Sequence, residues 1–172
     1  MRMIATRLGP ADRYDHLHCV RADGSATEVE MPRHGALPHD LIHAIVESAL
    51  GFSDGFIGLV ARGADMAFAA QQFQDYIDPA RHAQVAQAES VVESLQAQLW
   101  SGAFDADAFA YGVETACAMR GVAPPDFSGC DPRMRLFEPV AALGAAWHAL
   151  PPRGQWVLQF PLATGFHLAL AA

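Results

Sequence analysis

Two histidines four residues apart, His39 and His43, form the most chemically informative spacing in the sequence. They lie in residues 37–51, LPHDLIHAIVESALG, where Pro38 favours a helix start and Gly51 favours a helix end. Side chains at positions i and i+4 of a helix lie one above the other, about 5–6 Å apart at Cβ. Two imidazole rings at this spacing can bind one divalent metal ion.

A metal ion at this helix needs further ligands. Glu47 follows His43 by four residues, but three positions four apart span about 12 Å of rise, so Glu47 could join only if the helix leaned toward the metal. A third ligand from another element is easier to place, and His16, His18 and His34 are the nearest histidines in sequence. Zinc, iron, nickel and manganese all accept such ligand sets.

His16 and His18 form a second candidate pair. Residues 14–21 alternate between polar and apolar side chains, so both rings are expected on one face of a strand. This spacing recurs among metal ligands, but it is also expected of an ordinary solvated strand face. The pair becomes more informative if its strand face packs against the helix that carries His39 and His43.

The helix pattern is not the HExxH of zinc proteases, because Asp40 stands where the catalytic glutamate would be. Asp40 also has an ordinary role in the first helical turn, at the positive end of the helix dipole. Asp40 and Glu47 could satisfy the His43 ring by local hydrogen bonds without any metal. A structural role and a metal-binding role for His39 and His43 therefore both remain open.

Turn, capping and periodicity signals predict the elements that position these residues. Strands are expected at 1–7, 14–21, 26–31, 155–160 and 166–171, and helical segments at 38–51, within 52–68, from Asp78-Pro79 to Gly102, at 105–121 and from Asp131-Pro132 to 150. The pattern predicts a single α+β domain over residues 1–172. A small antiparallel sheet, made from the N-terminal hairpin and C-terminal strands, is expected to be packed by about four to five helices.

Composition narrows the partners and the compartment. The net charge of −8 and the absence of any Lys/Arg cluster argue against nucleic-acid and anionic-membrane binding. No signal peptide or transmembrane segment is indicated, and three scattered cysteines fit a reducing compartment, so we expect a cytoplasmic protein. The charged fraction of 17% and the alanine-rich helices leave apolar surface that a homodimer could cover.

Residues 37–61, LPHDLIHAIVESALGFSDGFIGLVA, resemble a pattern found in a family of small uncharacterised bacterial proteins, LPHDLxHxxVE followed by GFxGLxA. Residues 147–154, WHALPPRG, are similar to the closing part of the same proteins. The resemblance implies one α+β domain with the HDLIH helix at its centre. It implies no activity, because none is known for that family.

Two functional interpretations follow from the sequence, and whether the protein is an enzyme stays open. In the first, it is a binding or interaction module of unassigned role whose histidines are structural. In the second, it binds a divalent metal such as zinc, as a metal-binding protein or metal-dependent hydrolase, through His39 and His43 together with His16, His18 or Glu47.

Overall fold

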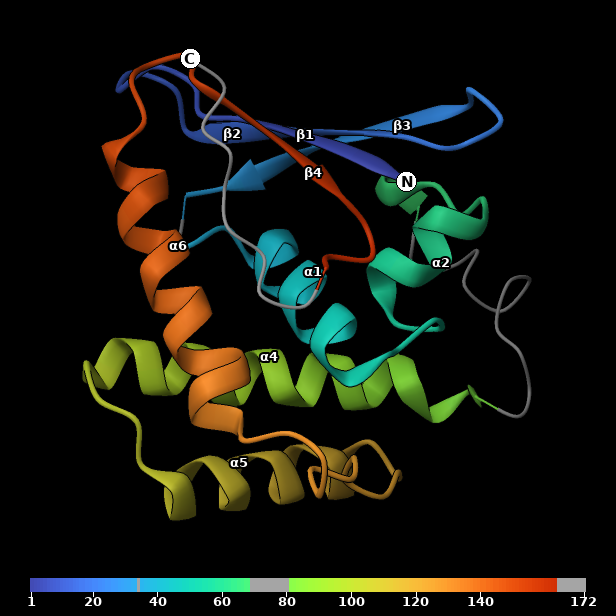
Figure 1. Cartoon of the computed structure of the whole chain (residues 1–172), viewed down its shortest axis with the longest axis vertical. Coiled ribbons are helices and arrows are strands. Elements are labelled where there is room, and N and C mark those ends of the chain that lie inside the picture. The colour runs from blue at the N-terminus through green and yellow to red at the C-terminus, as the bar shows by residue number, and fades with distance from the viewer. Residues whose placement is uncertain (34, 69–80, 164–172) are drawn as a thin grey trace.

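The computed structural model describes residues 1–33, 35–68 and 81–163, and its framework is a four-stranded antiparallel sheet packed by helices (Figure 1). The strands are β1 (Arg2–Thr6), β2 (Tyr14–Val20), β3 (Ala26–Pro32) and β4 (Gln155–Gln159), in the sheet order β3-β2-β1-β4. Strand β1 pairs with both β2 and β4, so the two ends of the described chain meet in one sheet. This arrangement confirms the predicted α+β class.

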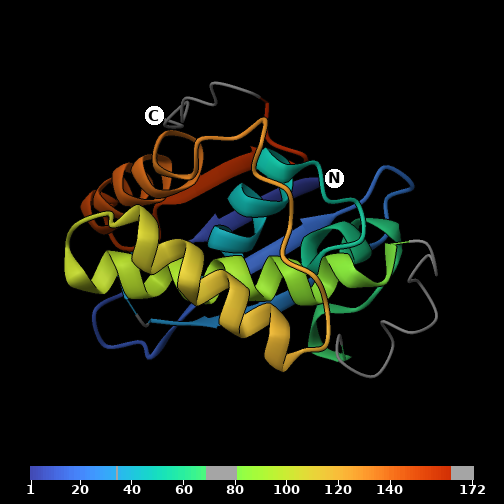
Figure 2. The ribbon, with the colours of Figure 1, turned by 90° about the horizontal axis from the view of Figure 1, so that it is seen from below.

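Alternation along β2 separates the two faces of the sheet. Leu17 and Cys19 point into the core and are fully buried, whereas His16 and His18 point the opposite way and stay half-buried. The described helices all lie on the side of the buried residues (Figures 1 and 2). The face with His16 and His18 is therefore the one that these helices leave uncovered.

The helices stack in layers below the sheet, with α1 between the sheet and α4, and with α5 on the far side of α4 (Figures 1 and 2). Their bounds are α1 (His39–Leu50), α2 (Phe56–Arg62), α4 (Ala83–Ser101), α5 (Ala106–Met119) and α6 (Glu138–Ala149), with a short 3₁₀ turn η1 (Met66–Phe68). Leu41 and Ile45 of α1 pack toward Trp156 of β4, as the amphipathic pattern of this helix requires. The opposite side of α1 faces α4.

The sequence predicts one regular helix after Asp131-Pro132, but the structure begins it with a π-helical turn, η3 (Arg133–Phe137), that runs into α6. Pro139 supplies the physical reason, because it has no N–H and its ring would clash with the carbonyl of Arg135 in a regular α-helix. A π turn changes the hydrogen-bond register just before the proline. A smaller difference is that Pro38 precedes the first turn of α1 instead of forming it.

Two expectations lie outside the described residues, namely the helix start at Asp78-Pro79 and the strand at 166–171. The described part of the long helix, α4, ends at Gly102 as expected, with that glycine in the left-handed conformation. None of the helices that the structure describes is both long and apolar enough to cross a membrane.

Candidate metal centre

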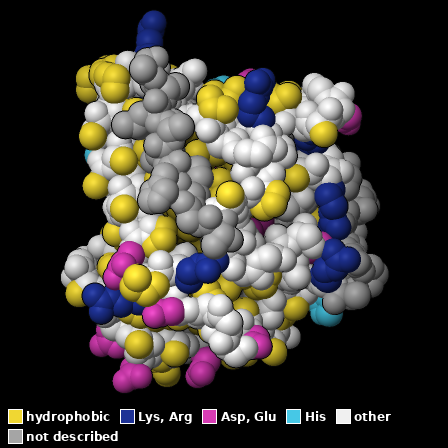
Figure 3. Space-filling model, viewed as in Figure 1, with side chains coloured by type: hydrophobic (Ala, Val, Ile, Leu, Met, Phe, Trp, Pro, Cys, Tyr) yellow, Lys and Arg dark blue, Asp and Glu magenta, His cyan; other side chains and the backbone are white. Residues whose placement is uncertain are grey.

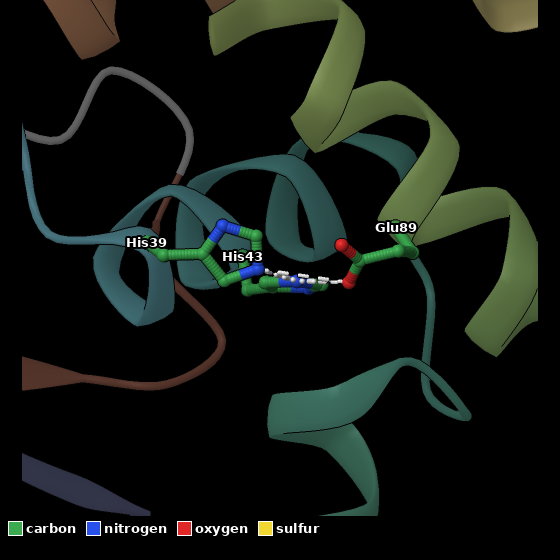
Figure 4. A group of neighbouring side chains, drawn as sticks. All are labelled: His39, His43 and Glu89. Carbon is green, nitrogen blue, oxygen red and sulfur yellow. Dashed lines mark hydrogen bonds and ion pairs between the residues drawn. The ribbon is translucent and has the colours of Figure 1, made fainter. Parts of the chain in front are cut away.

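Three side chains from two helices converge on one point at the interface of α1 and α4 (Figure 4). His43 Nε2 lies 3.1 Å from His39 Nε2 and 3.0 Å from Glu89 Oε2. The third edge of this triangle, from His39 Nε2 to Glu89 Oε2, measures 3.6 Å. The helical spacing of four residues therefore brings both rings to the same spot, and α4 supplies the carboxylate.

The size of this triangle fits a transition-metal ion. Tetrahedral bonds of about 2.0–2.2 Å from zinc to nitrogen and oxygen place neighbouring ligand atoms about 3.3–3.6 Å apart. The observed edges of 3.0, 3.1 and 3.6 Å differ from that range by about 0.3 Å at most. Two imidazole nitrogens and one carboxylate oxygen are also donors that zinc and iron accept.

Glu47 lies behind His43 and fixes the orientation of its ring. The His43 Nδ1–H donates to Glu47 Oε1 over 3.1 Å, and the backbone N–H groups of Ile57 and Gly58 donate to the same carboxylate over 3.1 and 2.9 Å. A hydrogen bond that holds the proton on Nδ1 leaves Nε2 as the nitrogen available for a metal. The structure thus places Glu47 as a support of His43, and not as the metal ligand that the sequence made possible.

The chain reaches this arrangement through the tight connection between α1 and α2. Gly51 ends α1 in the left-handed conformation, and the following residues turn so that the start of α2 meets Glu47. Gly55 lies directly against this carboxylate, and a Cβ atom there would overlap the Glu47 side chain. Glu47 is itself fully buried, so its three hydrogen bonds take the place of water.

In the metal-free chain, the carboxylates of Glu47 and Glu89 stabilise the protonated form of His43. Burial alone would lower the pKa of His43, but its hydrogen bonds to Glu47 and Glu89 outweigh burial and raise that pKa to about 9. Hydrogen bonds with His39 and His43 hold the pKa of Glu89 well below its usual range. In the metal-free chain, an imidazolium at His43 is therefore paired with two carboxylates. His39 Nε2 points to the same spot, 3.1 Å from His43 Nε2 and 3.6 Å from Glu89 Oε2.

The centre is closed on one side and open on the other. The His43 side chain is only 3% exposed, whereas those of His39 and Glu89 are 39% and 34% exposed. Phe56 covers the buried side, with its ring centroid 5.5 Å from that of His43. A fourth ligand could therefore approach from solvent past His39 and Glu89.

The hairpin histidines do not join this centre. His16 and His18 each lie 3.5 Å from Glu28 on the outer face of the sheet, on the opposite side from α1. The contact with His39 and His43 that the sequence left open is not formed, because the strand buries its other face against the helices. His34 lies outside the described residues, and Asp40 is half-buried beside the centre without belonging to the converging group.

Sequence reasoning missed Glu89, which is 46 residues from His43. Spacing along the chain carries no information about a contact between two helices so far apart. One sequence signal did point to Glu89. It lies four residues after Val85 and three before Val92, so it falls within the apolar stripe of α4. A carboxylate inside such a stripe is unusual unless it has a partner.

No protein-family model, curated protein or solved structure was found to be similar to the chain. The functional argument therefore depends on the geometry of the centre itself.

Proposed function

We propose that the protein binds one divalent transition metal, with zinc the best match to the donors, through His39, His43 and Glu89, and that the bound metal supports hydrolysis. The convergence of three ligand atoms on one point carries this proposal. Support comes from the buried carboxylate of Glu47, because metal-binding histidines commonly donate their other ring N–H to such a group.

The open side of the centre favours catalysis over a purely structural metal site. Structural zinc sites have four protein ligands, whereas catalytic sites have three and leave one position for water or substrate. The described residues supply three, and two of these are partly exposed. A zinc ion in such a site lowers the pKa of a bound water and polarises a carbonyl or phosphoryl oxygen. His43 and Glu47 would hold the buried side rigid, while His39 and Glu89 would border the entry of the substrate.

A second candidate function needs no metal. The pKa of His43, raised to about 9, allows an imidazolium that joins Glu47 of α1 to Glu89 of α4. In that case the group is a buried ion-pair cluster that fixes two helices, and the protein is a binding or interaction module. His39 would extend this cluster, because its Nε2 lies 3.1 Å from His43 Nε2 and 3.6 Å from Glu89 Oε2.

Metal analysis of protein purified without a histidine tag separates the two candidates. We expect close to one metal ion per chain in the wild type, and its loss in Glu89→Gln, which keeps the shape but weakens the ligand. Glu93→Gln is the matched control, since Glu93 lies one turn further along α4 and pairs with Arg120 at 2.7 Å. Wild-type protein that takes up no metal, even during titration with zinc, would favour the ion-pair cluster.

Hydrolysis is tested separately with chromogenic ester, amide and phosphoester substrates. We expect turnover of at least one class by the metal-loaded protein, its loss with a chelator and its return with added zinc. Glu93→Gln should retain this turnover and Glu89→Gln should not. Stoichiometric metal without metal-dependent turnover of any of these classes would contradict the hydrolytic part of the proposal and leave metal binding intact.

A further inference from the structure

A second concave site lies on the other side of α4 from the metal centre, between α5 and the loop of residues 122–133. Its volume is about 500 Å³, within the range of small-molecule pockets. The floor is formed by Phe109 and Val113 of α5, which are buried. Phe104 and Phe127 form aromatic walls, and each contacts Phe109, with ring centroids 5.4 and 5.8 Å away.

The loop wall of this pocket is held by its own hydrogen bonds. The Asp126 carboxylate accepts from the backbone N–H and the hydroxyl of Ser128, over 2.8 and 2.9 Å. The Asp131 carboxylate accepts from the backbone N–H of Arg133 over 2.9 Å, and the Cys130 N–H donates to the carbonyl of Phe127 over 2.9 Å. A wall that is already ordered loses little conformational entropy when a ligand binds.

The rim of the pocket is negative. Glu114, Asp131 and Arg133 are its charged lining residues, and the Arg133 guanidinium pairs with Glu138 at 3.1 Å. No ion pair is recorded for Glu114 within the described part of the chain. Residues 103–138 contain six acidic side chains and three arginines, and acidic side chains gather over α5 at the lower end of the molecule (Figure 3).

We propose that this pocket binds a small molecule with an aromatic or alicyclic body and one positive charge, such as an aromatic amine or a quaternary ammonium compound. The apolar floor and the proline-rich loop would cover the body of the ligand. Phenylalanine rings attract a cation over their faces, and the carboxylates at the rim complete the match. The same carboxylates repel an anionic ligand of similar size. Because α4 separates the two sites, this inference does not depend on the proposed metal function.

The test uses the cationic dye thioflavin T and the anionic dye 8-anilinonaphthalene-1-sulfonate, each titrated into the full chain and followed by fluorescence. We expect saturable binding of thioflavin T with one site per chain, and weaker binding of the anionic dye. Glu114→Gln should weaken thioflavin T binding about fivefold, as expected for one partly exposed ion pair. Asp107→Asn is the matched control, since it removes an acidic charge from the same helix outside the pocket, and it should leave the affinity unchanged.

A second variant fills the pocket without removing any charge. Ala110 is exposed and lines the pocket, so Ala110→Trp should abolish thioflavin T binding while the circular dichroism spectrum and the unfolding temperature stay close to those of the wild type. The proposal is overturned if thioflavin T does not bind saturably or the anionic dye binds as tightly. It is equally overturned if folded Ala110→Trp and Glu114→Gln both bind thioflavin T like the wild type.

Discussion

The part of the chain that the structure describes contains two groups of two histidines and a glutamate, and these groups differ in burial and in how closely their ligand atoms approach one another. His16, His18 and Glu28 lie on the outer face of the sheet, where each ring is 3.5 Å from the same carboxylate. Around His43, by contrast, ring nitrogens and a carboxylate oxygen meet within 3.0–3.6 Å in the interface of α1 and α4. Only the second group brings three ligand atoms within reach of one ion.

The difference lies in what stands behind the side chains. The sheet histidines have more than a third of their side-chain surface exposed, and the carboxylate that they share, Glu28, is 64% exposed. His43 is buried and is held from behind by Glu47, which is itself held by the backbone of α2. Preorganised ligands lose less entropy when a metal binds. Residue type and spacing therefore indicate two candidate metal sites. The hydrogen bonds behind His43 favour the one at His39, His43 and Glu89 over the one at His16 and His18.

The comparison is tested most strongly by removing each histidine pair. His39→Ala with His43→Ala removes two of the three proposed ligands and should reduce zinc affinity by more than about a thousandfold, since even outer-shell changes cost 10–100-fold. His16→Ala with His18→Ala should leave the affinity unchanged. Competition titrations against a zinc-binding dye measure both. Loss of metal from the sheet variant alone would reverse the assignment of the site.

The second-largest expected effect is the pH dependence of zinc affinity at the group around His43. The His43 pKa of about 9 lies above the ordinary value of 6.5, so below pH 9 a metal must displace the proton on Nε2. The Nδ1 proton stays in its bond to Glu47. Zinc affinity should therefore rise about tenfold per pH unit, or about a hundredfold from pH 6 to pH 8, and level off above pH 9. The same titration measures it, and an affinity independent of pH between 6 and 8 would show that His43 is not the titrating ligand.

Glu47→Gln tests the hydrogen bonds that support His43 and leaves all three proposed metal ligands unchanged. The amide keeps the shape but cannot accept from all three donors, so the His43 ring loses its fixed orientation and zinc affinity should fall about 10–100-fold. Glu28→Gln is the corresponding change beside the sheet histidines and should have no effect. Equal affinities for wild type and Glu47→Gln, both folded, would mean that Glu47 contributes only to packing.

Much of the fold could be predicted from local signals, because turns, caps and strand alternation act over a few residues. Asp23-Gly24 correctly predicted the hairpin turn, and Gly51 and Gly102 correctly predicted the ends of α1 and α4. The terminal strands β1 and β4 share one sheet, as expected, although their direct pairing was not predicted. The π turn before Pro139 was not predicted, because the pattern after Asp131-Pro132 was interpreted as one regular helix, although Pro139 disfavours a regular α-helical hydrogen bond at this point.

Only the part of the candidate site that lies within one helix could be predicted from the sequence. The four-residue spacing gave the convergence of His39 and His43, because one helix sets both positions. The contribution of Glu89 depends on the packing of α4 against α1, and the separation of His16 from the site depends on which strand face is buried. Both depend on tertiary packing, which a single sequence does not determine. An exception is a residue that interrupts a pattern, as Glu89 interrupts the apolar stripe of α4.

A substitution at Gly55 has the smallest expected effect, and it tests how firmly Glu47 is held behind His43. A Cβ atom at this position would overlap the Glu47 carboxyl group, so Gly55→Ala must displace either this carboxyl group, with its hydrogen bonds to α2, or the connection before α2. We expect a loss of about 2 kcal/mol of unfolding free energy, as for other overpacked interiors, measured by urea denaturation. Gly129→Ala is the matched control, because no atom lies within 4 Å of its added Cβ, and its stability should be unchanged or slightly higher. If the two variants were equally stable, Glu47 could move away from α2 without cost, and His43 would be held no more firmly than the histidines of the sheet.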